Sequence, residues 1–232
     1  AKRVAVVGAG AAGLACAVTA AERGHAVTLY EAARTIGGQM NLAAAIPGKE
    51  FAETTRYFAR RIERLGVTLR LGTRPSAAEL ASGAFDESVV ATGVTPRIPA
   101  LEGVDHPKAL RYDEVLSGAK RTGRRVAIVG AGGIGFDVAV FLSAPDGDHF
   151  LDAWGVDRSG ASPGGLAPPV PEAAPRQIWL LQRKPTPAGK TLGATTGWAI
   201  RAELARRGVK ILVGVEYRRI DDRGLHVVHD GA

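Results

Sequence analysis

The chain has 232 residues, 46% of them hydrophobic, and a formal charge of +7 from 30 Lys or Arg against 23 Asp or Glu. This length allows one or two domains with a sizeable core. The arginines are scattered without a long basic run, which argues against nucleic acid as a partner. No stretch reaches the roughly 18 to 20 apolar residues of a membrane span, and no signal-peptide cleavage site follows the apolar start. We therefore expect a cytoplasmic protein with neither a membrane nor a nucleic-acid partner.

Side chains of the metal-binding and nucleophilic types are few. Cys16 is the only cysteine, which excludes an internal disulfide, a Cys-x-x-Cys redox pair and a cysteine-ligated iron–sulfur cluster within this chain. Its Ala and Leu neighbours predict a buried small hydrophobe rather than a nucleophile. The five histidines show neither metal-ligand nor triad spacing, so we assign no metal site and no catalytic side chain. They are His25, His106, His149, His226 and His229.

The first part of the chain predicts a β-α-β opening. Residues 3–8 are an apolar run that ends in glycine, as in a central parallel strand. An Ala-rich helix over 11–23 is ended by Gly24. Apolar side chains at 51, 58, 62 and 65 have helical spacing. The remaining predicted elements are a strand at 26–31, an irregular stretch at 32–49, a helix at 50–65, and strands at 67–71 and 86–91.

The opening pattern then repeats after a proline-containing connection over 94–124. Residues 144–175, rich in Pro, Gly, Asp and Ser, predict a long surface insertion. The other predicted elements are a strand at 125–130, a helix at 133–143, a strand at 177–182, a helix at 197–207, a strand at 209–213, and a hairpin of 215–220 with 225–229. The duplication predicts an α/β protein of two Rossmann-like dinucleotide-binding domains, residues 1–104 and 105–232.

The first glycine fingerprint is Gly8, Gly10 and Gly13, a G-x-G-x-x-G directly after a strand. Gly8 permits the tight turn, Gly10 lets a pyrophosphate approach the backbone, and Gly13 lets helix and strand pack. The helix N-terminus offers unpaired N–H groups to the phosphates. Glu31 ends the second strand, where a carboxylate accepts hydrogen bonds from a ribose diol and repels a 2′-phosphate. This site suits FAD or NAD, unless Glu31 is merely a solvated strand end.

Paired glycines follow this carboxylate. Gly37, Gly38 and Gln39 predict a loop that passes close to the diphosphate and flavin, with an ordinary flexible loop as the alternative.

The second fingerprint is Gly130, Gly132 and Gly135, and it begins 122 residues after the first. The strand after it leads into Arg183 and Lys184 instead of an acid. A cationic pair there would neutralise a 2′-phosphate, and Arg183 can grip it with two parallel hydrogen bonds. This predicts NADPH rather than NADH. The alternative is a basic surface turn.

The three tryptophans all lie in the second half of the chain. Trp154, Trp179 and Trp198 are predicted to be core or interface residues rather than stacking platforms. The sequence Thr195-Thr196-Gly197-Trp198 either caps the following helix through a Thr side chain or forms a wall near the nicotinamide.

Taken in order, GAGAAGLACAVTAAERGHAVTLYEA, IGGQMNLAAAIPGKEF, ATGVTPRIP, VAIVGAGGIGFDVA, LLQRK and TTGW resemble the C-terminal half of the bacterial NADPH-dependent 2,4-dienoyl-CoA reductases. This family is related to trimethylamine dehydrogenase and the NADH:flavin oxidoreductases. The resemblance runs nearly end to end. It implies two nested domains of the glutathione and thioredoxin reductase kind, C-terminally truncated because the last NADPH-domain strand and the final FAD-domain segment would follow.

The resemblance also implies an electron path. NADPH would reduce FAD here, and a 4Fe-4S cluster would pass electrons to FMN in a separate barrel domain, whose ligands are not in this chain. The candidate FAD-binding residues are Gly8, Gly10, Ala11, Ala12, Gly13, Glu31, Ala32, Gly38, Gln39, Arg74, Ala91, Thr92 and Gly93. The candidate NADPH-binding residues are Gly130, Gly132, Gly133, Ile134, Gly135, Arg183 and Lys184.

Two other functions remain open from the sequence. The first is a domain that binds ADP or FAD only structurally, as in the amine dehydrogenase relatives. The second is an interaction module that docks to a barrel partner.

Overall fold

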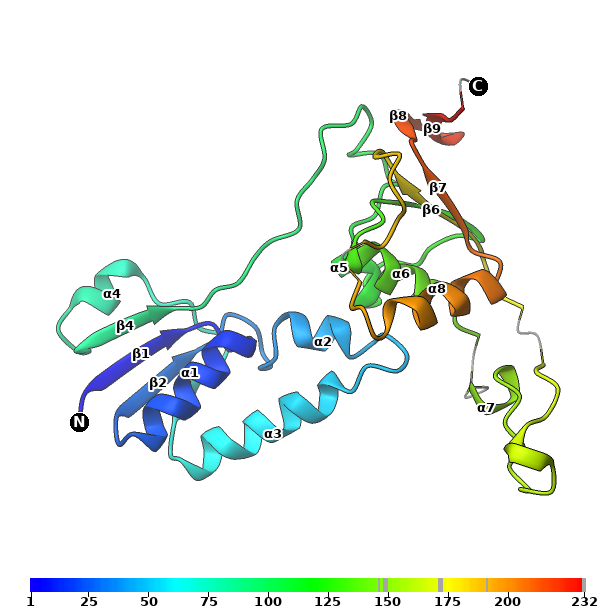
Figure 1. Cartoon of the computed structure of the whole chain (residues 1–232). Helices are drawn as coiled ribbons and strands as arrows, with labels where there is room; N and C mark the ends of the chain where they lie inside the picture. The colour runs from blue at the N-terminus through cyan, green and yellow to red at the C-terminus, as the bar shows by residue number, and fades with distance from the viewer. Residues whose placement is uncertain (146, 148–149, 171–172, 191, 231–232) are drawn as a thin grey trace. The chain divides into compact units, whose positions relative to one another are not determined.

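The computed structural model describes residues 1–145, 147, 150–170, 173–190 and 192–230. They form two compact units, Ala1–Pro96 and Arg97–Ala232 (Figure 1). The sequence places the boundary a few residues later, at 104. Residues 97–104 group with the second unit because the Ile220 N–H donates to the Glu102 carbonyl at 2.9 Å, and Gly103 packs against the Ile220 backbone.

The first unit is built on a parallel sheet of order β3-β2-β1-β4. β1 is one of the two inner strands, and its Val4, Ala5 and Val6 are buried, as the unbroken apolar run predicts. The elements are β1 (Arg3–Val7), α1 (Ala11–Glu22), β2 (Ala26–Tyr30), α2 (Gln39–Ala43), α3 (Phe51–Arg64), β3 (Thr68–Arg70), α4 (Ala77–Ala81) and β4 (Glu87–Val90).

Two helices cover one apolar cluster in this unit. Leu14 of α1 and Ile62 of α3 join Val6 and Leu29 of the sheet, and Phe58 packs against them. Phe51, one of the four apolar residues at helical spacing, is the first residue of α3 and is 38% exposed.

The second unit has a parallel sheet of order β5-β6-β7 and a separate two-stranded hairpin. Phe136 of α6, Leu180 of β6 and Leu204 of α8 are fully buried and form its centre. The elements are α5 (Tyr112–Leu116), β5 (Arg125–Val129), α6 (Gly133–Ser143), α7 (Phe150–Ala153), a 3-10 turn η1 (Pro163–Gly165), β6 (Gln177–Gln182), α8 (Gly197–Arg206), β7 (Lys210–Val213), β8 (Glu216–Asp221) and β9 (Gly224–Val228).

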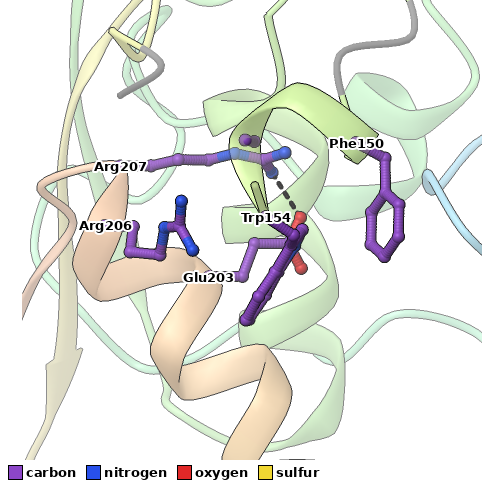
Figure 2. A pocket seen from close by; sticks show the side chains of 6 residues that line it. Phe150, Trp154, Glu203, Arg206 and Arg207 are labelled. Carbon is purple, nitrogen blue, oxygen red and sulfur yellow. Dashed lines mark ion pairs between the residues drawn. The ribbon is translucent and has the colours of Figure 1, made fainter. Parts of the chain in front are cut away.

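The described part of the insertion has structure of its own. Val156 and Leu166 form an antiparallel bridge, and α7 packs against α8 (Figure 2). There the Arg206 guanidinium lies 4.8 Å from the centre of the Trp154 ring. Residues 146, 148–149 and 171–172 of this segment lie outside the described residues. They include His149, one of the five histidines.

Two expectations about burial hold only in part. Trp198 is the second residue of α8 and is 62% exposed, so it is not a core residue, and its place at an interface stays a prediction. Cys16 is half-buried, since it lies at the edge of the α1 stripe that packs on the sheet. Within the described residues, no helix combines the length and apolar character that crossing a membrane requires.

Candidate dinucleotide-binding sites

The first fingerprint turn is held by close packing at two of its three glycines. A Cβ on Gly13 would lie 1.8 Å from the Gly8 carbonyl oxygen, and one on Gly8 would lie 2.4 Å from the Ala91 carbonyl oxygen. Gly8 also has φ of +107°, which side-chain-bearing residues rarely adopt. Gly10 has nothing within 4 Å of its Cβ position. The turn is therefore closed toward the sheet and open at Gly10, where α1 begins.

Glu31 is directed back at this turn rather than out into solvent. Its Oε2 accepts the Ala9 N–H at 2.8 Å, and its Oε1 accepts the Ala33 N–H at 2.8 Å. The residue is half-buried. A carboxylate oxygen can accept more than one hydrogen bond, so both oxygens keep capacity for hydroxyl donors. This arrangement differs from the solvated strand end that was the alternative.

The loop after β2 returns to the same turn. The Gly37 N–H donates to the Ala9 carbonyl at 2.8 Å. Gly38 has φ of +53°, and a Cβ there would lie 3.2 Å from the Gly10 Cα. The Gln39 side-chain amide donates to the Val94 carbonyl at 3.2 Å. The loops after β2 and β4 thus meet at the start of α1.

The other FAD-side candidates lie at the same edge of the sheet. The Ala91 N–H donates to the Val7 carbonyl at 2.8 Å, and the Thr73 N–H donates to the Glu31 carbonyl at 2.8 Å, which puts Arg74 next to the end of β2. Further residues at this edge with exposed side chains or backbone are Ala11, Ala12, Ala32, Arg74, Thr92 and Gly93.

The second turn repeats the geometry of the first. Gly130 has φ of +105°, and a Cβ on Gly135 would lie 1.9 Å from the Gly130 carbonyl oxygen. Gly132 and Gly133 have open space at their Cβ positions. Gly132 has φ and ψ of −89° and −174° before α6, against −78° and −173° for Gly10 before α1. Ile134, the last candidate here, is 49% exposed.

Backbone hydrogen bonds give the correspondence between the two second strands. The Gly8 N–H donates to the Tyr30 carbonyl at 2.8 Å, and the Gly130 N–H donates to the Leu181 carbonyl at 2.9 Å. Gln182 therefore occupies the place of Glu31. Arg183 and Lys184 occupy the places of Ala32 and Ala33, and both cations are exposed.

Gln182 is a site residue that sequence reasoning missed. Its side-chain amide donates to the Lys184 carbonyl at 3.0 Å and to the Thr186 carbonyl at 2.6 Å. It thereby folds the cationic loop back on itself. Its position as the last residue of the strand was the available signal, because the acid of the first unit stands at the same place.

In both units, the loop after the second strand returns to the glycine turn. The Gly189 N–H donates to the Ala131 carbonyl at 3.4 Å, as Gly37 donates to Ala9. Gly189 was not recognised from the sequence, because the loop before it is longer than its counterpart. The predicted Thr cap of α8 is wrong: Thr196 occupies the N-cap position, but its side chain makes no capping bond.

Among the described residues, which leave out His149, no three His, Cys, Asp or Glu side chains gather as they would around a metal ion.

Two glycine turns, each joining a parallel strand to an open helix start, define a protein that binds two dinucleotides. The chain belongs to the pyridine nucleotide-disulphide oxidoreductase family, whose model matches residues 2–231. It is a flavin and pyridine-nucleotide oxidoreductase domain with two Rossmann-like halves, as the sequence predicts.

Curated relatives carry several activities in their names. The chain is 40% identical over 149 residues to a metal reductase of Desulforamulus reducens, a match that covers 61% of this chain and 22% of the relative. It is 42% identical over 134 residues to an N,N-dimethylglycine/sarcosine dehydrogenase of Chromohalobacter salexigens, covering 55% and 19%. The matched segment thus spans about a fifth of the length of these relatives.

Among solved structures, a 2-naphthoyl-CoA reductase in complex with 2-naphthoyl-CoA is similar over the whole chain, with a TM-score of 0.81 and 27% identity. The match covers 31% of that protein. Thioredoxin reductase of T. acidophilum is similar in fold, with a TM-score of 0.59, 17% identity, and coverage of 98% of this chain and 74% of that one.

Proposed function

We propose that this chain binds FAD at the first turn and NADPH at the second, as the part of a larger enzyme that accepts reducing equivalents from NADPH. One observation carries the proposal. Two turns with similar backbone geometry differ at the end of the second strand: a carboxylate faces the first turn, and a glutamine followed by two exposed cations stands at the second.

The residues of the first turn fit FAD. A side chain at position 10 would fill the open space at the helix start, so the glycine leaves room for a diphosphate beside the N–H groups of Ala11 and Ala12. Glu31, held by two backbone N–H groups, would accept the hydroxyls of the adenosine ribose. Gly38 and Gln39 would line the approach to the flavin.

The residues of the second turn fit NADPH. Gly132 and Gly133 leave the start of α6 open. Gln182 carries no charge that would repel a 2′-phosphate, and Arg183 and Lys184 would attract one.

When both groups are bound, the nicotinamide supplies a hydride and the flavin accepts it. The chain's own side chains then bind, orient and exclude water, and none is needed as a general acid. The chain's one cysteine, Cys16, lies half-buried on α1, so the proposal includes no dithiol chemistry within this chain.

We further propose that the whole protein resembles the 2,4-dienoyl-CoA reductases and is cytoplasmic. A barrel domain with FMN and a 4Fe-4S cluster would then receive the electrons and reduce the enoyl substrate. The ordered motifs from GAGAAG to TTGW support this assignment. The similarity to a reductase that acts on a naphthoyl-CoA supports an acyl-CoA substrate.

One alternative is favoured by a specific relative. The similarity to an amine-type dehydrogenase supports a domain that holds ADP or FAD structurally and passes no hydride from NADPH. Purified chain that is yellow and is bleached by NADPH without oxygen supports hydride transfer. Colourless chain that binds ADP supports the alternative.

The sharper experiment is the double substitution Arg183→Ala with Lys184→Ala, with NADPH and NADH affinities measured by calorimetry. Loss of charged hydrogen bonds of about 1.5 to 3 kcal/mol should weaken NADPH by roughly 10- to 100-fold. NADH should change by less than about threefold. Arg60→Ala with Arg64→Ala, on α3 of the first unit, removes the same charge and should leave both affinities unchanged. Equal losses for the two nucleotides would refute the role of the cationic pair.

A further inference from the structure

We propose that Tyr217 is a positioning residue for nucleotide choice. Through the end of β6, it holds the cationic loop in the conformation that favours a 2′-phosphate. The inference rests on the proposed function, because it concerns the same NADPH site.

The geometry centres on one backbone oxygen. The Leu181 carbonyl accepts the Gly130 N–H at 2.9 Å and the Tyr217 hydroxyl at 3.0 Å. A carbonyl oxygen has two lone pairs, so both are engaged. One atom therefore joins the glycine turn, the strand end that precedes Arg183, and the hairpin strand β8.

The segment before Tyr217 engages the next carbonyls of the same loop. The Val215 N–H donates to the Gln182 carbonyl at 3.0 Å, and the Gly214 N–H donates to the Lys184 carbonyl at 3.2 Å. The carbonyls of residues 181, 182 and 184 thus all have donors. Their partial negative charge is compensated, so it opposes an anion at Arg183 less than bare carbonyls would.

The first unit provides an internal reference. There the Thr73 N–H donates to the Glu31 carbonyl at 2.8 Å, and the Gly72 N–H donates to the Ala33 carbonyl at 2.9 Å. These two hydrogen bonds correspond to those that Val215 and Gly214 donate, so both units have this pair of backbone hydrogen bonds. Two residues further along each chain segment, Tyr217 corresponds to Pro75, which has no hydroxyl. The hydrogen bond from the tyrosine is therefore present only in the second unit, beside Arg183 and Lys184.

The protonation state of Tyr217 suits this role. Burial raises the pKa of the phenol, while the neighbouring positive charge of Arg183 acts in the opposite direction. The hydroxyl therefore remains a neutral donor at physiological pH, and a neutral phenol beside Arg183 does not compete with a phosphate for its charge, as a carboxylate would.

The test is Tyr217→Phe, which removes only the hydroxyl. NADPH should bind about three- to tenfold more weakly, the effect expected of one lost hydrogen bond. NADH should change by less than about twofold. Adenosine 2′,5′-bisphosphate against AMP should show the same contrast without involving the nicotinamide or flavin. Tyr57→Phe, at an exposed position on α3 of the first unit, is the matched control and should leave all four affinities unchanged.

The ratio of the two affinities decides the outcome. Partial unfolding of the variant lowers both affinities by the same factor and cancels in the ratio. If Arg183→Ala with Lys184→Ala abolishes the preference but Tyr217→Phe leaves the ratio unchanged, the positioning role is refuted while the proposed function stands. If the double substitution also leaves the ratio unchanged, the proposed function fails, and this inference fails with it.

Discussion

The two glycine turns have similar backbone conformations, but the residues at the end of the strand beside each turn differ in charge. At each turn, the third glycine packs against the carbonyl of the first, and the N–H of the first donates to the second strand. Beyond that strand, Glu31 accepts two backbone N–H groups, whereas Gln182 donates to two backbone carbonyls. At equivalent positions of the two units, one side chain therefore acts as a hydrogen-bond acceptor and the other as a donor.

This difference separates what the fold requires from what the ligand requires. Gly8, Gly13 and Gly135 leave no room for a Cβ, and Gly8 and Gly130 have φ of +107° and +105°, so the fold itself requires glycine at these four positions. A Cβ on Gly10 or Gly132 would meet nothing within 4 Å, so packing does not require glycine there, and the open space suits the close approach of a diphosphate. The strand-end residues give each turn its electrostatic character, which the proposed function connects with the choice of dinucleotide.

The largest expected effect tests the first part of this comparison. Gly13→Ala or Gly135→Ala would force a Cβ to within 2 Å of a backbone oxygen. Because overpacking against backbone cannot relax through a rotamer, we expect a loss of about 2 to 4 kcal/mol in the affected unit. Gly10→Ala and Gly132→Ala are the matched controls and should cost less than about 1 kcal/mol. Calorimetric unfolding of the four variants measures this. Equal losses at the second and third glycines would mean that the close packing is not what holds the turn.

The helices and strands that form the two glycine turns could be predicted from the sequence. Both fingerprint helices and the strands before them were located to within a residue or two, because periodicity and glycine spacing mark them. The five-residue helices α2, α4 and α5 were missed, since one turn and a half gives no periodic signal.

Long-range contacts could not be predicted in the same way. The return of Gly37 to Ala9, the role of Gln182, and the bond from Tyr217 to Leu181 depend on which loops meet at the sheet edge. Their residues are ordinary in a one-dimensional pattern. For Trp198 only the core part of the prediction is wrong: a large aromatic side chain suggests burial, but at the start of α8 this one is 62% exposed.

A smaller effect tests the acid of the first turn. Glu31→Gln keeps the shape but replaces one acceptor oxygen with an N–H₂ group beside the N–H donors of Ala9 and Ala33. Loss of charged acceptors for the ribose hydroxyls should weaken FAD by about 10-fold. NADPH affinity should stay within about twofold, since its strand end is in the other unit. Fluorescence titration with FAD and calorimetry with NADPH measure the two effects. Unchanged FAD affinity would leave Glu31 with only a structural role.

The smallest expected effect concerns the start of the first strand in each unit, at the end of the strand away from the glycine turn. Arg3 and Arg125 are the first residues of β1 and β5. Arg3 pairs with Asp86 at 2.9 Å, whereas the Arg125 guanidinium lies 5.6 Å from the Trp179 ring centre. Hydrogen bonds from the Arg3 side chain and backbone hold the pKa of Asp86 at about 2, below its ordinary 3.8. The first unit therefore has an acid-sensitive pair where the second has a cation–π contact.

The sign of the pH effect follows from this lowered pKa. The ionised Asp86 contributes stability above its unfolded pKa of 3.8, and this contribution is lost as the pH falls through about 2. Asp86→Asn should therefore melt slightly below the native protein near neutral pH, and the gap should close as the pH falls from about 4 to about 2. All three tryptophans lie in the second unit, so their fluorescence follows that unit and far-UV circular dichroism reports both. The gap should appear in the dichroism and be absent from the fluorescence, because Asp86 lies in the first unit. A gap of the same size at every pH would instead assign the loss to packing rather than to the titration of the ion pair.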